Sequence, residues 1–113
     1  MADHTATVAT SEEGGLIILS PSGDMGTHES PVLRSALRGA IDRKPRRVVV
    51  DLAGVGYMAT AGLATLVESL RASREASVEL VLCNLQPRVR AVFDIARLAA
   101  VFRISGTLDE AKH

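Results

Sequence analysis

The segment RVVVDL at residues 47–52 constrains the fold of this chain more than any other part of its sequence. Three successive valines with no polar residue between them are typical of a parallel strand that is buried on both faces. Such a strand needs parallel neighbours and crossover helices that cover the sheet. Residues 16–20 (LIILS) and 78–84 (VELVLCN) supply two further apolar runs, so the sequence predicts an α/β fold.

The segments between these strands have the apolar periodicity of helices. Apolar residues recur at helical spacing over residues 33–41, 63–70 and 89–96. Ser30-Pro31 and Pro87 precede the first and the third of these stripes, and each can form the first turn of a helix.

The two ends of the chain carry weaker signals. Residues 5–10 alternate weakly and predict a first strand, which would form a hairpin with residues 16–20 through Gly14-Gly15. Residues 100–104 (AVFRI) predict a last strand, followed by a helical turn from about Leu108. The order ββαβαβαβα therefore predicts a mostly parallel sheet of four to five strands, with an N-terminal hairpin strand, three to four helices and right-handed crossovers.

Composition indicates one domain with an aliphatic core. The chain has 113 residues, which is the usual size of a single domain, and 47% of them are apolar while only 3% are aromatic. No repeat, low-complexity tract or linker divides the sequence. We therefore expect a single domain over residues 1–113, with short tails at about 1–4 and 110–113.

Charge and hydropathy argue against nucleic acid and membrane as partners. Lys plus Arg equals Asp plus Glu at 13 each, and no basic stripe is interleaved with aromatic residues. No stretch approaches the ~18 apolar residues of a membrane helix, and the N-terminus has no basic start followed by an apolar run. We expect a cytoplasmic protein without membrane insertion. Its single cysteine, Cys83, lies at the end of an apolar run and is expected to be an inert core thiol.

The sequence offers no convincing catalytic or cofactor site. Residues 54–59 formally match the dinucleotide fingerprint, but the following apolar stripe begins only at Leu63 and the next strand ends in Cys83-Asn84 instead of an acid. We expect these glycines to allow a tight loop at the sheet edge. The three histidines, His4, His28 and His113, have no ligand spacing. We therefore expect a protein that is not an enzyme and that binds neither NAD nor a metal ion.

Thr60 stands between the central strand and the second predicted helix. This is the natural N-cap position, where its hydroxyl would accept a hydrogen bond from a backbone N–H of the first turn. It is also expected to be an exposed hydroxyl at the carboxyl edge of the sheet, where open α/β sheets present binding surfaces. A phosphate there would add about −2 charges to that surface. Both roles are compatible with one side chain.

Residues 48–70 (VVVDLAGVGYMATAGLATLVESL) resemble the core motif of STAS domains in the anti-sigma factor antagonist family: an apolar strand ending in Asp-Leu, a loop, and then Asp-Ser-Ser/Thr-Gly-Leu at the start of a helix. Residues 23–37 are similar to the Gly-Glu-Leu-Asp loop and first helix of the family. Residues 84–104 are similar to its third helix and last strand. The resemblance covers most of the chain.

The resemblance implies that the chain regulates transcription by binding a kinase-type anti-sigma factor, a serine/threonine kinase that can inactivate the antagonist by phosphorylation. It places Thr60 at the phosphoacceptor position and aligns Gly62-Leu63 with the Gly-Leu of the motif. This sequence departs from the motif at Ala59, Ala61 and Gly26, where the family has Asp, Ser or Thr, and Asp. A non-switching STAS module, in a signalling assembly or a lipid-transport ATPase, is the alternative.

We expect the partner surface to combine two loops at one sheet edge with the side of the second helix that lies off its apolar stripe. Its predicted residues are Asp24, Gly26, Thr27, Tyr57, Met58, Ala59, Thr60, Ala61, Gly62, Thr65, Glu68 and Ser69. The chain is expected to be a monomer or a weak dimer.

Overall fold

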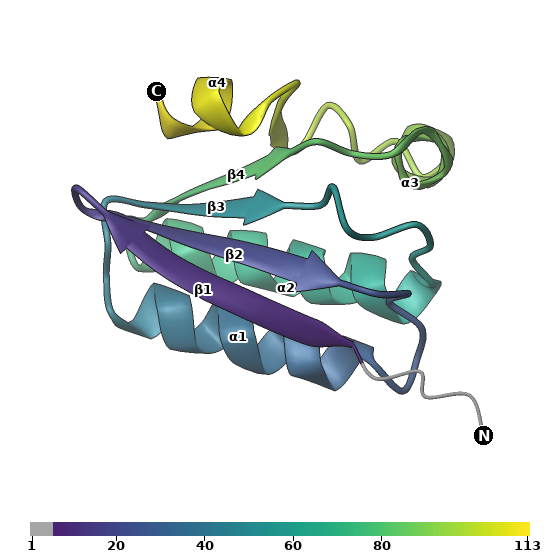
Figure 1. Ribbon diagram of the computed structural model, residues 1–113, viewed down its shortest axis with the longest axis horizontal. Helices are drawn as coiled ribbons and strands as arrows, with labels where there is room; N and C mark the ends of the chain where they lie inside the picture. The colour runs from purple at the N-terminus through teal and green to yellow at the C-terminus, as the bar shows by residue number, and fades with distance from the viewer. Residues whose placement is uncertain (1–5) are drawn as a thin grey trace.

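A five-stranded sheet in the order β1-β2-β3-β4-β5 forms the centre of the computed structural model, which describes residues 6–113 (Figure 1). Pairing is antiparallel between β1 and β2 and parallel elsewhere, as the sequence predicted. The strands are β1 (Thr7–Glu13), β2 (Leu16–Ser22), β3 (Arg47–Asp51), β4 (Glu79–Cys83) and β5 (Arg103–Ser105). The helices are α1 (Ser30–Asp42), α2 (Thr60–Glu75), α3 (Pro87–Ile95) and α4 (Leu108–Lys112).

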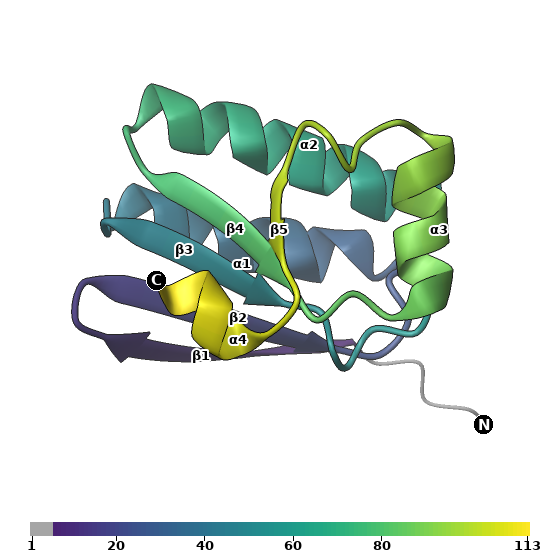
Figure 2. The ribbon, with the colours of Figure 1, turned by 90° about the horizontal axis from the view of Figure 1, so that it is seen from above.

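β3 is the central strand, and its three valines are fully buried. Side chains alternate between the two faces of a strand, so Val48 and Val50 belong to one core cluster and Val49 to another. The larger cluster lies on the face that α1 and α2 cover, and the smaller lies under α4 (Figures 1 and 2). The prediction of a strand buried on both faces is therefore confirmed.

Both weakly predicted strands exist with shifted bounds. β1 extends to Glu13, because the hairpin turn is made by Gly14 and Gly15, whose φ angles of 53° and 83° suit glycine. β5 begins at Arg103 instead of Ala100, because the amides of Val101 and Phe102 donate to the Leu98 carbonyl and close a turn.

The expected C-terminal tail at 110–113 was wrong, since α4 extends to Lys112 and Ala111 is fully buried. The expected N-terminal tail at 1–4, with His4, lies outside the described residues.

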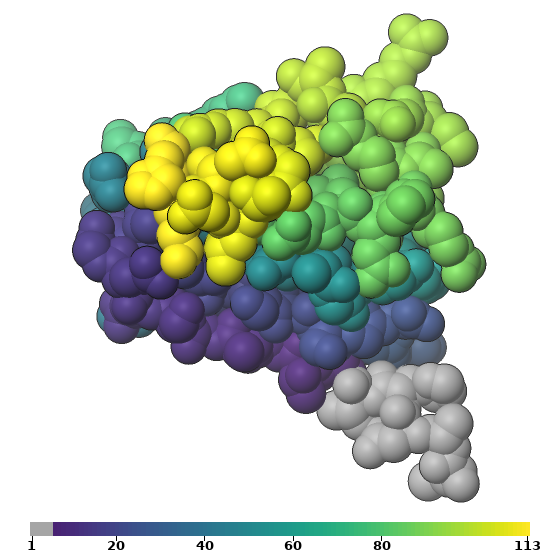
Figure 3. Space-filling model, turned by 45° about the horizontal axis from the view of Figure 1, so that its top comes forward, coloured from purple at the N-terminus to yellow at the C-terminus, as the bar shows by residue number. Residues whose placement is uncertain are grey.

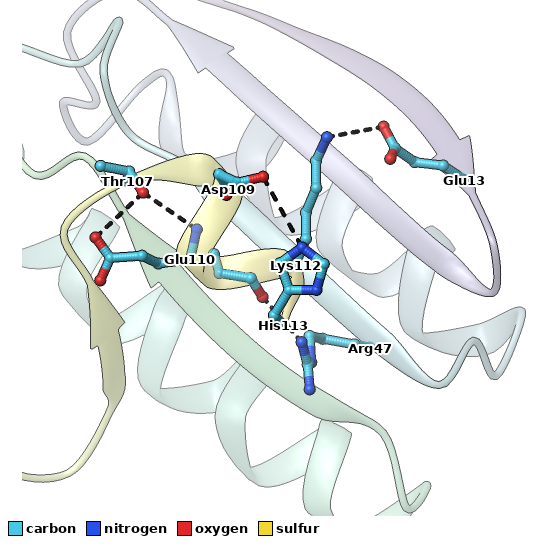
Figure 4. A network of polar contacts seen from close by, with 8 residues as sticks. Glu13, Arg47, Thr107, Asp109, Glu110, Lys112 and His113 are labelled. Carbon is cyan, nitrogen blue, oxygen red and sulfur yellow. Dashed lines mark hydrogen bonds and ion pairs between the residues drawn. The ribbon is translucent and has the colours of Figure 1, made fainter.

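Polar contacts attach the short helix α4 to the sheet (Figure 4). The Thr107 hydroxyl caps the helix by accepting from the Glu110 amide at 3.1 Å. Lys112 pairs with Glu13 of β1 at 3.1 Å, and Arg47 Nη1 donates to the Ala111 carbonyl at 3.0 Å. The Arg47 side chain is only 9% exposed, so this contact is a buried link between α4 and the central strand.

Glu79 joins Arg47 to the last strand. Its two carboxylate oxygens accept from Arg47 Nε at 2.7 Å and from Arg103 Nη1 at 2.6 Å. Burial alone would raise the pKa of the Glu79 carboxyl, but hydrogen bonds from Arg103 and Arg47, together with their positive charges, hold that pKa below its ordinary value. The charged carboxylate therefore stabilises the fold.

Replacement of Glu79 with Gln should lower the free energy of unfolding at pH 7 by on the order of 1 kcal/mol, because solvent screens a half-exposed carboxylate. The folded-state pKa lies below the ordinary value of 4.5, so this stabilisation is present above that pH and is lost as the pH falls through the folded pKa. Urea titrations from pH 7 to pH 3 should show the unfolding free energies of the wild type and Glu79→Gln converging.

Glu75→Gln is the matched control, since Glu75 has no ion pair within residues 6–113. A difference that stays constant with pH would contradict the assignment.

Candidate functional site at the carboxyl edge of the sheet

The loops that follow β2 and β3 are joined by backbone hydrogen bonds. Gly23 N donates to Gly54 O at 3.0 Å, Met25 N to Tyr57 O at 2.9 Å, and Ala59 N back to Met25 O at 2.9 Å. These bonds continue the parallel pairing of the two strands beyond their ends. The result is an ordered platform, which we call the loop surface and define as residues 24–28 and 56–62.

Buried side chains hold the loop surface from below. Met25 is fully buried and Met58 is 2% exposed, and the two residues face each other across an isolated bridge. Gly54 supports the expectation of a tight loop, since a Cβ there would stand 3.0 Å from the Pro21 carbonyl oxygen.

Gly62 allows the first turn of α2 to pack against the methionines. A Cβ at this position would lie 2.7 Å from Met58 Cγ and 3.3 Å from Met25 O. Met58 is enclosed by the core, so it has little room to move away. Gly62 is itself buried and allows α2 to pack closely against these residues.

Thr60 is exposed and is the first residue of α2, so the prediction that it caps this helix was wrong. The N-cap is Ala59, because Gly62 N and Leu63 N both donate to the Ala59 carbonyl, at 2.9 and 3.2 Å. Alanine has no side-chain oxygen, and α2 accordingly begins without a side-chain cap. The Thr60 hydroxyl has no hydrogen-bond partner within the described chain.

The structure divides the predicted partner residues into exposed and buried groups. Exposed or partly exposed are Asp24, Gly26, Thr27, Tyr57, Ala59, Thr60, Ala61 and Glu68. Met58, Gly62, Thr65 and Ser69 are buried, so the expectation that these residues are exposed on a partner surface was wrong. The first group therefore remains the predicted partner surface.

The error at Thr65 and Ser69 has a physical reason. Both hydroxyl residues lie on an inward side of α2, together with Ser73 at the same helical spacing. Thr65 Oγ1 donates to the Ala61 carbonyl at 3.0 Å, and Ser73 Oγ donates to the Leu70 carbonyl at 2.7 Å. A hydroxyl that is satisfied within its own helix, as at Thr65 and Ser73, can be buried at low cost, whereas Ser69 keeps 7% of its surface exposed.

The outward side of α2 is formed by Thr60, Ala64, Glu68 and Arg71. Ala64 was missed because a single alanine in a helical pattern does not indicate which side is exposed. Glu68 pairs with Arg34 of α1 at 3.0 Å. The outward positions nearest Thr60 are therefore small and uncharged.

The remaining polar groups at this edge stabilise the loops. Asp51 Oδ1 accepts from Ala53 N and from Asn84 Nδ2, both at 3.1 Å. Cys83 is buried, and desolvation together with the Asp51 charge raises the pKa of its thiol to about 12, as suits an inert core thiol. Residues 6–113 contain no cluster of three metal-ligating side chains, and none of their helices has the length and hydropathy to cross a bilayer.

The chain resembles known proteins both in sequence and in fold. Residues 7–111 match the family described as STAS domain. The Bordetella bronchiseptica protein named "Putative anti-sigma factor antagonist BtrV" is 32% identical over 97 residues, covering 86% of this chain and 84% of BtrV. The crystal structure of an anti-sigma factor antagonist from Mycobacterium paratuberculosis superposes with a TM-score of 0.84 at 24% identity, covering 97% of this chain and 93% of that one. Bacillus SpoIIAA in its phosphorylated form has a TM-score of 0.70 at 17% identity, with 93% and 96% covered.

Two helical glycines should respond to alanine with opposite signs. Gly62→Ala should destabilise the domain by about 1–3 kcal/mol, because the added methyl group overpacks the contact with Met58 and Met25. Gly39→Ala should stabilise it by about 0.5–1 kcal/mol, because a Cβ at this exposed position in α1 meets no atom within 4 Å. Chemical denaturation of both variants measures the difference. Equal effects of the two substitutions would show that α2 does not rest on the methionines.

Proposed function

Because the chain belongs to the STAS domain family, we propose that it is an anti-sigma factor antagonist that acts by binding another protein and not by catalysis. Its partner would be an anti-sigma factor of the serine/threonine kinase type, and binding would free a sigma factor for transcription. The similarity to BtrV over most of both chains supports this role. The observation that carries it is the exposed, unengaged hydroxyl of Thr60, which stands at the first position of α2 on an ordered surface.

We further propose that phosphorylation of Thr60 ends the interaction. A phosphate at the first turn of a helix lies at the positive end of the helix dipole, so it should leave the fold intact. On the loop surface, however, its charge would have to lose water when the complex forms. The switch would therefore act on binding and not on stability.

The carboxylates of this surface differ in position from those of the family motif. A Cβ at Gly26 would stand 2.6 Å from Glu29 Oε1, which accepts from the Gly26 amide at 3.1 Å. Glu29 thus fills the space that an acidic side chain at position 26 would need. Asp24 Oδ1 lies 4.0 Å from the place where a Cβ on Gly56 would stand, so a second carboxylate borders the loop of Thr60.

A non-switching STAS module is the second candidate, and Ala59 and Ala61 favour it. These residues leave the immediate neighbours of Thr60 without the acid and the second hydroxyl of the motif. Such a module would bind its partner constitutively in a larger assembly.

Substitutions of Thr60 should separate binding from stability. Thr60→Asp should weaken the complex with the purified anti-sigma factor by at least about tenfold, or ~1.4 kcal/mol, because its charge must be desolvated. Thr60→Ser and Thr60→Ala should bind as the wild type does. Thr60→Ala should also melt near the wild-type temperature, because the Thr60 hydroxyl caps nothing. Calorimetry and thermal melts give both quantities, and wild-type affinity in Thr60→Asp would refute the switch.

Ala59→Asp tests the switching role against the non-switching one. An acid at this N-cap should stabilise the domain by about 1 kcal/mol under either proposal, because it supplies the missing cap. If the kinase reads this acid, the rate of Thr60 phosphorylation should also rise, as measured with the purified kinase and labelled ATP. Ala64→Asp is the control: it adds the same charge one turn further along α2 without capping it. Absence of Thr60 phosphorylation in both the wild type and Ala59→Asp would favour the non-switching module.

A further inference from the structure

Ile95, at the end of α3, is 84% exposed and is the most exposed of the large apolar residues in the described chain. The opposite side of α3 is well packed, since Val89 and Phe93 are buried in the larger core cluster. Phe93 also meets Phe102 with ring centroids 5.7 Å apart. The helix is therefore firmly seated, and the exposure of Ile95 is a property of its outward side.

Exposed arginines precede and follow Ile95 along the chain. Arg88, Ala91 and Ile95 are three and four residues apart and lie on one side of the helix. Arg97 follows two residues after the end of α3. Within residues 6–113, neither Arg88 nor Arg97 forms an ion pair, whereas Arg90 is paired with Asp94. Asp94 is the only acidic residue of residues 87–103. We call Arg88, Ala91, Ile95 and Arg97 the α3 patch.

The N-terminal end of α3, which carries Arg88, adjoins the loop surface. Gln86, the N-cap residue of α3, donates from Nε2 to the Ala53 carbonyl at 2.7 Å, and its Oε1 lies 3.6 Å from the place where a Cβ on Gly56 would stand. The next residue of that loop, Tyr57, is 47% exposed. α3 lies at the same end of the molecule as the start of α2 (Figure 2), and its residues, coloured green, form part of the outer surface there (Figure 3).

We propose that the α3 patch is a second docking element for the anti-sigma factor, and that it receives an apolar side chain flanked by carboxylates. This inference rests on the proposed function. An isoleucine that becomes buried contributes favourable apolar burial, and two guanidinium groups without an ion pair in residues 6–113 select acidic partners.

The charges argue against two other occupants. Two copies of the patch placed face to face would bring arginine against arginine, which is unfavourable. A membrane surface requires clusters of about 4–8 basic residues, and the patch offers two unpaired arginines. An acidic protein segment fits the charge and the apolar centre together.

The test measures affinity for the purified kinase-type anti-sigma factor encoded in the same genome. Ile95→Ser and the double variant Arg88→Glu/Arg97→Glu should each weaken binding about tenfold, and the double variant should also slow association at low salt. Thermal melts should stay at the wild-type value, since all three side chains are exposed. Arg46→Glu, a charge reversal on an exposed residue just before β3, is the matched control and should bind normally.

The possible failures of the proposal are distinguishable. If both patch variants bind like the wild type while Thr60→Asp does not, the α3 patch is not a docking element and the proposed function stands. If the wild type binds no anti-sigma factor, both proposals fail. Dimerisation that depends on Ile95 in sedimentation experiments, or binding to anionic phosphatidylserine vesicles, would also overturn the assignment of the patch.

Discussion

The pairing of two loops beyond the ends of β2 and β3 is the constraint on which the rest of the site depends. Parallel strands normally diverge into independent loops at their carboxyl ends, but here Gly23, Met25 and Ala59 donate backbone hydrogen bonds across the gap. The last of these bonds holds the residue directly before α2. The position of Thr60 is therefore fixed by main-chain hydrogen bonds, which need no side-chain oxygen at positions 59 and 61. This explains how the surface can tolerate alanine at positions 59 and 61 and still present an ordered hydroxyl.

The two faces of the sheet are closed by different means. α1 and α2 cover one face with aliphatic side chains, whereas α4, with five residues, covers the other. A helix of this length is not stable alone, so it depends on its contacts with the sheet. Arg47 provides the link, because its guanidinium bonds both the Ala111 carbonyl and Glu79. Arg47, the first residue of β3, thus has a structural role. The other end of β3 leads into the candidate site.

The elements that the sequence predicted well are those whose signal is local. β3 was predicted from its run of valines, and α1 and α3 from their apolar stripes at helical spacing. The structure confirms all three elements. The candidate site was predicted less well, since burial of Thr65 and Ser69 depends on how closely two helices approach, and hydroxyl residues are commonly exposed. The N-cap at Ala59 was missed for a related reason: propensity favours threonine as a cap, but the backbone bond from Ala59 to Met25 sets where α2 begins. Long-range contacts thus decided the details that local patterns could not.

Separation of stability from recognition is the physical property that suits this domain to regulation. The side chains that hold the loop surface together, Met25 and Met58, are buried, as is Gly62 beneath the first turn of α2, so a partner does not meet them directly. The residues that are exposed on it, Thr60 and Tyr57 among them, contribute few contacts to the fold. A charge placed on Thr60 would meet the open amide end of α2, where negative charge is favourable. Its unfavourable consequence would arise only when a partner excludes water from that surface, so one covalent change could alter binding while the core that presents it remains the same.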